Sequence, residues 1–268
     1  MPSINISKLR FQISELVDHF SDPVHFCKSF YEVLDHYSRR SLRPGDESIA
    51  KTFMPTFNCP DQVIKQIVLG LQVSIKMEPD SALDIVDILW QDKYLESREL
   101  AAKVLGNLPI EFTGKIMDRI ILWAKPNLDK AALELLFSEA THCILRENSK
   151  LLEDAVVQML DKKDIEWQSL GLEALVIMIK NPDYNRVPSL FKLISPFILE
   201  TDDLVQLKTE AVLSALIERT PIESAYFLKQ SLGYSQRNQV ERIIRRLLPN
   251  FPPDLRVTLL DAIYQSKK

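Results

Sequence analysis

The chain of 268 residues is 46% hydrophobic and 26% charged, with a formal net charge of −4 and a pI near 5.7. This balance is typical of a soluble globular protein with a sizeable core, and the overall acidity gives no indication of a polyanion-binding protein. No run approaches the ~20 apolar residues of a membrane span, and the N-terminus lacks the apolar segment of a signal peptide. We therefore expect a cytoplasmic protein that does not contact a membrane.

The first 58 residues are less regular than the rest. Two helices are predicted over residues 6–20 and 22–41, and Asp22 followed by a proline is a typical start for the second. Residues 42–62 contain three prolines and predict a loop with a short helical turn. The end of a repeat array is often atypical because it must shield the core from water. We predict that residues 1–58 form a helical N-terminal cap, and a small separate helical unit remains the alternative.

From residue 61 onward, apolar residues recur at spacings of three and four, as on one face of a helix. Residues 80–90 carry such a stripe, which ends in Trp90. Residues 95–109 carry another, which weakens at Gly106, and Pro109 prevents its extension. The two stretches predict a pair of short helices with a tight connection.

The same pair recurs along the chain. The first helices of later pairs are predicted over residues 111–124, 149–161, 186–200 and 221–233. The second helices are predicted over residues 128–145, 165–180, 204–219 and 236–249. Small residues mark places in the second helices that we interpret as equivalent, at spacings of 31, 39 and 40: Ala101, Ala132, Gly171 and Ala211.

A period near ~40 residues made of two helices is typical of HEAT-like or armadillo-like repeats. A short side chain lets crossing helices approach to roughly 8–10 Å. No stretch shows the alternation of a β-strand flanked by turn residues. The sequence therefore predicts an all-α fold, an α-solenoid of HEAT-like helical hairpin repeats, with one continuous array over residues 59–268 after the cap.

The stretch around the first pair resembles a known family. In the bacterial DNA alkylation repair glycosylases built from HEAT-like repeats, a Leu-Trp ends one helix, a Glu follows six residues after the Trp, and an Ala begins the packed part of the next helix. Here these positions are Leu89, Trp90, Glu96 and Ala101. The clear resemblance covers about twenty residues, and a weaker similarity of repeats extends over about two-thirds of the chain.

The resemblance implies a basic concave surface that binds damaged DNA, a pair of tryptophans followed by two aspartates, and an Arg after a later Trp. In this chain the tryptophan pair is replaced by Asn127 and Leu128, and the first aspartate matches Asp129. The essential carboxylate is replaced by Ala132, which cannot stabilise positive charge on a sugar. The later Trp is retained as Trp167, but the Arg is replaced by Ser169, which cannot bind a phosphate bidentately.

The tryptophans have structural interpretations beside the functional one. Trp90 and Trp123 lie 33 residues apart at the ends of first helices, and this regularity favours packing over chemistry. Trp167 lies at the start of a second helix, where a concave surface would run, so packing and ligand contact are both open. Glu96 is expected to cap its helix or to pair with Arg98 or Lys103.

Other catalytic or metal-binding patterns are not found. No two of the four histidines lie on one helical face in the way that the ligands of a HExxH zinc motif do, one turn apart, and no Gly-rich phosphate loop or GxSxG motif occurs. The three cysteines are expected to be reduced thiols, since they form no CxxC pattern: Cys27, Cys59 and Cys143. We predict no catalytic residues, no metal and no small-molecule cofactor.

Charge is unevenly distributed. Residues 229–268 contain eight basic and three acidic residues, a net charge of +5. Phosphate contacts by such clusters would weaken as salt rises, but a solvated helix face or an acidic protein partner also accounts for them. The candidate DNA-binding residues are Trp167, the cluster of Arg39, Arg40 and Arg43, and the cluster of Arg242, Arg245 and Arg246.

The sequence thus favours a non-catalytic interaction scaffold related to the DNA alkylation repair proteins, which binds a protein or peptide on its concave face. The alternative is a protein that binds double-stranded DNA, or a divergent glycosylase that acts on alkylated bases.

Overall fold

The computed structural model describes residues 5–38, 52–233 and 237–265, and every regular element in these ranges is helical. The predicted all-α class is confirmed for this part of the chain. The chain divides into two compact units, Met1–Glu147 (unit 1) and Asn148–Lys268 (unit 2). The boundary at residue 58 and the continuous array after it stay predictions.

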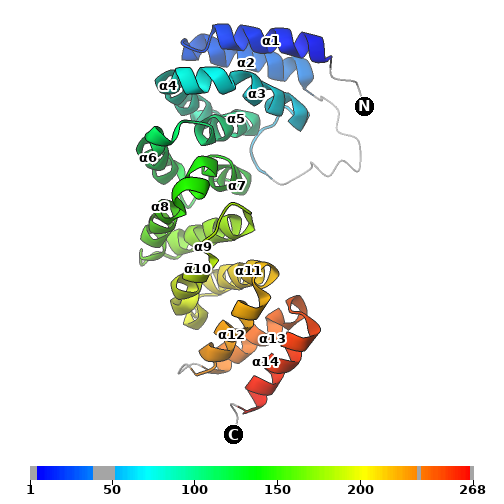
Figure 1. Cartoon of the computed structure of the whole chain (residues 1–268), viewed down its shortest axis with the longest axis vertical. Helices are drawn as coiled ribbons and strands as arrows, with labels where there is room; N and C mark the ends of the chain where they lie inside the picture. The colour runs from blue at the N-terminus through cyan, green and yellow to red at the C-terminus, as the bar shows by residue number, and fades with distance from the viewer. Residues whose placement is uncertain (1–4, 39–51, 234–236, 266–268) are drawn as a thin grey trace. The chain divides into compact units, whose positions relative to one another are not determined.

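Successive odd-numbered helices stack on one another in unit 1. The α-helices in its described part are α1 Ile6–Asp18, α2 Pro23–Tyr37, α3 Asp61–Met77, α4 Pro79–Gln91, α5 Leu95–Gly106, α6 Thr113–Trp123 and α7 Lys130–Ser138, and a 3₁₀ turn, Ile110–Phe112, precedes α6. Helix α3 packs against α1, α5 packs against α3 and α7, and α4 packs against α2 and α5 (Figure 1). The first two helices are therefore in direct contact with the helices that follow them.

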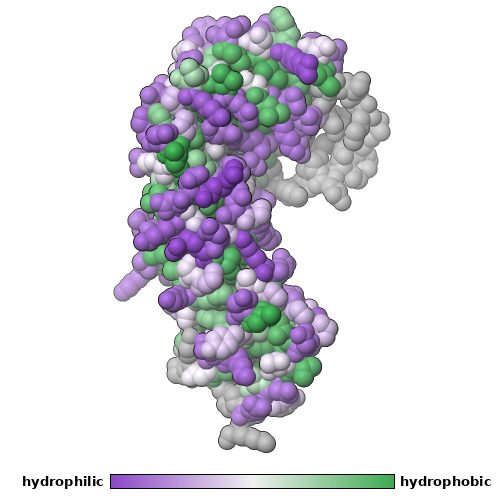
Figure 2. Space-filling model, in the orientation of Figure 1, coloured by the Kyte–Doolittle hydropathy of each residue, from purple (hydrophilic) through white to green (hydrophobic). Residues whose placement is uncertain are grey.

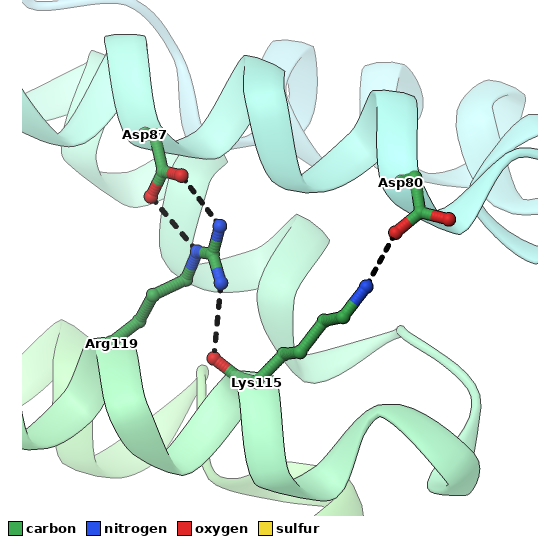
Figure 3. A network of polar contacts seen from close by, with 4 residues as sticks. All are labelled: Asp80, Asp87, Lys115 and Arg119. Carbon is green, nitrogen blue, oxygen red and sulfur yellow. Dashed lines mark hydrogen bonds and ion pairs between the residues drawn. The ribbon is translucent and has the colours of Figure 1, made fainter.

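Two ion pairs join α4 to α6 (Figure 3). The guanidinium of Arg119 contacts the carboxylate of Asp87 through Nε at 2.8 Å and Nη2 at 2.5 Å. The Nζ atom of Lys115 lies 2.6 Å from Asp80 Oδ1. The Lys115–Asp80 pair is exposed and the Arg119–Asp87 pair is partly exposed, and ion pairs at the surface contribute about 0–1 kcal/mol each. The buried apolar side chains therefore stabilise the stack, and the ion pairs fix how α4 and α6 lie against each other.

Unit 2 begins at a break within a helix. Helix α8, His142–Leu160, contains a non-helical residue at Asn148 (φ −152°, ψ 68°), where the two units meet in the sequence. The later helices are α9 Ile165–Lys180, α10 Val187–Ile194, α11 Asp203–Arg219, α12 Pro221–Ser231, α13 Arg237–Leu247 and α14 Pro253–Gln265, with 3₁₀ turns at Ser195–Leu199 and Leu248–Asn250. Helix α11 packs against α9, α12 and α13, and α14 packs against α12.

One predicted helix is interrupted. The second helix expected over residues 128–145 ends at Ser138, and α8 begins at His142. Between them, the hydroxyl of Thr141 donates a hydrogen bond to the carbonyl of Phe137 at 2.7 Å. A Cβ atom on Gly106, at the end of α5, would overlap the carbonyl oxygen of Glu139. Glycine is therefore required where α5 meets the chain that follows α7.

The four small residues do not occupy equivalent places. Ala101, Ala132 and Gly171 are buried, whereas Ala211 is exposed. The feature that does recur is an aspartate before each of α7, α9 and α11, whose side chain accepts a hydrogen bond from a first-turn N–H group. These N-cap residues are Asp129, Asp164 and Asp202.

The visible surface of unit 1 is mostly hydrophilic, with hydrophobic residues showing between hydrophilic ones (Figure 2). Within the described residues, no helix combines the length and the apolar character that a membrane span requires. In the same ranges, no group of three or more His, Cys, Asp and Glu side chains could hold a metal ion.

A cluster of carboxylates lies between the stacked odd-numbered helices of unit 1. Lys103 on α5 forms ion pairs with Glu99 at 3.7 Å and with Glu139 at 3.1 Å. Burial raises the pKa of Glu99 to about 7, although Lys103 opposes the shift, and Asp61, Glu139 and Glu96 raise it further. The folded pKa of Glu99 therefore lies above its unfolded value.

We predict that Glu99→Gln stabilises unit 1 at pH 8 but changes little at pH 5. A raised folded pKa means that the contribution of Glu99 to stability is full below the unfolded pKa of 4.5, is lost as the pH rises from there to about 7, and is therefore still mostly present at pH 5. Urea unfolding at the two pH values should show a gain on the order of 1–3 kcal/mol at pH 8 only. The exposed Glu32→Gln variant is the matched control, and an equal gain at both pH values would contradict the assignment.

Candidate functional site

An extended segment, residues 52–60, crosses unit 1 between α2 and α3 in the sequence and contacts helices far from it. The N–H group of Leu95 donates to the carbonyl of Pro55 at 3.0 Å. The ring of Phe57 lies 4.3 Å from that of Tyr94 and 6.4 Å from that of Tyr31, measured between ring centres. These contacts fix the segment beside the N-terminus of α5.

Asp129 ties this segment to α7. Its Oδ1 atom accepts hydrogen bonds from the Thr52 hydroxyl and the Ala131 N–H, both at 2.9 Å, and its Oδ2 atom accepts one from the Phe53 N–H at 3.0 Å. Burial raises the pKa of Asp129, but the donors from Phe53, Thr52 and Ala131 outweigh it, and the pKa lies below its usual value. Asp129 is therefore an ionised N-cap whose two oxygens already have donors.

Two tryptophans form the wall beside Asp129. The rings of Trp90 and Trp123 are stacked with their centres 4.6 Å apart and their planes 10° from parallel, and only 5% and 8% of the residues are exposed. The guanidinium of Arg98 lies over the Trp90 ring at 5.5 Å from its centre, and its Nε donates to the Asp92 carbonyl at 3.3 Å. The packing role expected from the spacing of these tryptophans agrees with this geometry.

These groups surround an open pocket of about 560 Å³. Its polar lining contains two cations, Arg98 and Lys125, and one carboxylate, Asp129. Lys125 is exposed, and neither cation forms an ion pair with another residue in the described ranges. The apolar lining includes Met54, Leu122 and Leu128 beside the two tryptophans. The arrangement can bind an anionic group next to an apolar one.

The resemblance to the repair family implies functional residues at certain positions. The residues of this chain at two of those positions, Ala132 and Glu96, have other surroundings. Ala132 is fully buried on α7 and faces no solvent. Glu96 is 7% exposed, and its Oε2 atom has no hydrogen-bond partner. The expected pairing of Glu96 with Lys103 is not seen, because Lys103 pairs with Glu99 and Glu139 instead.

Trp167 lies in the first turn of α9 in unit 2 and is half-buried. The Nζ atom of Lys162 lies 3.0 Å from the centre of its ring, so one aromatic face carries a cation already. Helix α11 packs against both α9 and α13, and no contact between Trp167 and the arginines of α13 is seen in the described residues. A DNA contact by Trp167 stays a prediction.

The arginine clusters are only partly open to a ligand. Arg245 pairs with Glu241 at 2.8 Å, and Arg246 pairs with Glu210 at 2.7 Å. Arg242 is exposed and forms no ion pair with a residue in the described ranges. The other cluster lies outside the described residues: Arg39, Arg40 and Arg43. DNA binding by either cluster stays a prediction.

The sequence interpretation did not select Arg98 and Lys125 as binding residues. Both are common surface residue types, and only the fold brings the turn after α6 next to the first turn of α5. The recognisable signal at this place in the sequence was the aspartate ahead of α7, which marks a helix start.

Comparison with known proteins identifies the family. A family model described as DNA alkylation repair enzyme matches residues 33–247, from within α2 to the end of α13. The chain therefore belongs to the DNA alkylation repair enzyme family, as the residues around Trp90 suggested.

The other comparisons add little. No curated protein matches the chain. Among solved structures, the crystal structure of an engineered protein from a structural genomics consortium is similar, with 19% sequence identity and a TM-score of 0.37. The match covers 92% of this chain, which spans 66% of that engineered protein.

We predict that Asp129→Ala lowers the stability of unit 1 by about 1–2 kcal/mol, because the α7 N-cap and the tie to residues 52 and 53 are lost together. Urea unfolding followed by the fluorescence of the stacked tryptophans measures the effect. Glu134→Ala, an exposed change on the same helix, is the control and should be near neutral. Equal stability of the two variants would show that the tie contributes nothing.

Proposed function

We propose that this chain is a non-catalytic member of the DNA alkylation repair enzyme family that acts as an interaction scaffold. In this proposal the helix pairs form an α-solenoid of HEAT-like repeats, with residues 1–58 as the cap and residues 59–268 as the array, and a cytoplasmic protein or peptide binds the concave face. The stacking of odd-numbered helices in unit 1 and of α9, α11 and α13 in unit 2 supports the repeat arrangement.

The proposal that the chain is non-catalytic rests on the hydrogen bonds of Asp129. A carboxylate that stabilises a developing cation must point an oxygen at the reacting sugar. Both oxygens of Asp129 instead accept hydrogen bonds from residues 52, 53 and 131, and the position matched to the essential acid is the buried Ala132. The tryptophan rings face each other, so they offer little open surface to a base.

We predict no release of alkylated bases. The purified chain, incubated with methylated duplex DNA, should free methylpurines no faster than buffer, because three donors hold Asp129 as a helix cap and Ala132 carries no acid. Chromatography of the released bases measures the rate. Release above buffer that Asp129→Asn abolishes would establish a glycosylase and overturn the proposal.

A second candidate function, binding of double-stranded DNA without chemistry, is favoured by one observation. Arg98 and Lys125 converge on one pocket and have no carboxylate partner there except the already bonded Asp129. Cations held in this way can contact backbone phosphates.

If Arg98 and Lys125 bind DNA in this way, the affinity for DNA should depend only weakly on the salt concentration. Two phosphate contacts should weaken binding about tenfold between ~50 and ~200 mM salt. Fluorescence anisotropy of a labelled duplex measures it, with Arg98→Gln and Lys125→Gln as the test variants and the exposed Lys28→Gln as the control. Flat anisotropy at the lower salt concentration would remove this candidate.

A further inference from the structure

We propose that the pocket between Arg98 and Lys125 binds an acidic side chain of an extended peptide, with an apolar neighbour of that side chain against Leu122 and Met54. The inference rests on the proposed function as a binding protein and names the chemistry of its partner at one site. Four features of the pocket lead to it.

The first feature is the incomplete bonding of Arg98. Its Nε atom donates to the Asp92 carbonyl and one face covers Trp90, but its terminal nitrogens have no hydrogen-bond partner among the described residues. Burial lowers the pKa of Arg98, while the carboxylates of Asp129 and Asp92 act in the opposite direction. A half-buried guanidinium that lies over an indole and has unbonded terminal nitrogens can bind a carboxylate through two parallel N–H bonds.

The second feature is the apolar wall next to the cations. Leu122 is 61% exposed although it lies beside the buried Trp123, and Met54 and Leu128 complete the same side of the pocket. Because an exposed apolar side chain loses contact with water when a ligand covers it, this wall favours a ligand with an apolar group beside its charge. A volume of about 560 Å³ lies in the range of pockets that hold small ligands or a few side chains.

The third feature separates a peptide from a nucleic acid. Neither tryptophan offers an open face to a base, since the two rings stack on each other, Arg98 lies over Trp90, and Trp123 is only 8% exposed. The nearby cations Lys103, Lys115 and Arg119 are already paired with carboxylates. Two unpaired cations beside the ionised Asp129 match one carboxylate better than a row of phosphates.

The fourth feature selects a side chain over a chain terminus. Capture of a C-terminal carboxylate relies on a concave set of backbone N–H groups. In this pocket the N–H groups of Phe53 and Ala131 already donate to Asp129. The remaining donors are the side chains of Arg98 and Lys125, which reach an acidic side chain that projects from an extended segment.

The test uses the indole N–H signals of the full chain. The protein has three tryptophans, so Trp167→Phe leaves only the signals of Trp90 and Trp123 in a ¹H–¹⁵N spectrum. The probe is a short Gly/Ser peptide with a central Leu-Glu pair and blocked ends. Two matched peptides serve as comparisons: one has Gln in place of Glu, and the other carries its only carboxylate at a free C-terminus. The fourth probe is an oligonucleotide.

We expect the Leu-Glu peptide to shift both indole signals in a saturable way, with an affinity about tenfold higher than that of the Leu-Gln peptide, because a charge-assisted pair is lost in the latter. Arg98→Gln should remove most of this difference, and Lys125→Gln, an exposed change that leaves the fold intact, should remove part of it. Lys28→Gln should leave it unchanged.

Equal titrations by the Glu and Gln peptides, or a preference that survives both Arg98→Gln and Lys125→Gln, would overturn the inference. Tighter binding by the C-terminal probe or by the oligonucleotide would overturn it in favour of that ligand. Base release from methylated DNA tests the proposed function separately. If the chain binds no acidic peptide and releases no base, only this inference is contradicted. If it releases bases, the proposed function is contradicted, whatever the peptide titrations show.

Discussion

The carboxylate of Asp129 joins two parts of unit 1 that lie far apart in the sequence. It caps α7 through the N–H of Ala131 and holds the segment before α3 through Thr52 and Phe53, which are 77 and 76 residues away. Since both oxygens are used, the position of the segment and the start of α7 depend on one ionised group. Met54, the next residue along that segment, becomes part of the pocket wall for this reason.

Most of the helices could be predicted because their apolar stripes are local. The bounds of α4, α5, α9 and α11 lie close to the predicted stretches. Asp22 is the N-cap of α2, as predicted from the proline that follows it. The break between α7 and α8 could not be predicted, because it depends on the Thr141 hydroxyl and on the approach of Gly106 to Glu139. The spacing of small residues wrongly placed Ala211 with three buried residues, although it is exposed. The aspartate N-caps mark the starts of α7, α9 and α11 more consistently.

The site was only partly readable from the sequence. The regular spacing of Trp90 and Trp123 at the ends of first helices predicted a packing role, and the structure adds that the two rings stack on each other. Of the roles expected for Glu96, which were a helix cap or a pair with Arg98 or Lys103, the pair with Lys103 is not seen, because Lys103 lies one helical turn from Glu99 and also reaches Glu139 across the stack. No local pattern shows that Asp129 meets Thr52, so the difference between a free acid and a structural cap becomes visible only in three dimensions.

The charge of the pocket bears on what it can bind. A site that stabilises a departing cationic base needs a net negative field, supplied by a carboxylate with an oxygen free to face the sugar. In this pocket three donors hydrogen-bond to the one carboxylate of the lining, while Arg98 and Lys125 form no ion pair with a described residue. With two cations against one carboxylate, the charged side chains of the lining favour an anion. In the proposed function, the absence of an acid at Ala132 and the use of Asp129 as a helix cap both favour a negatively charged ligand over a departing cationic base.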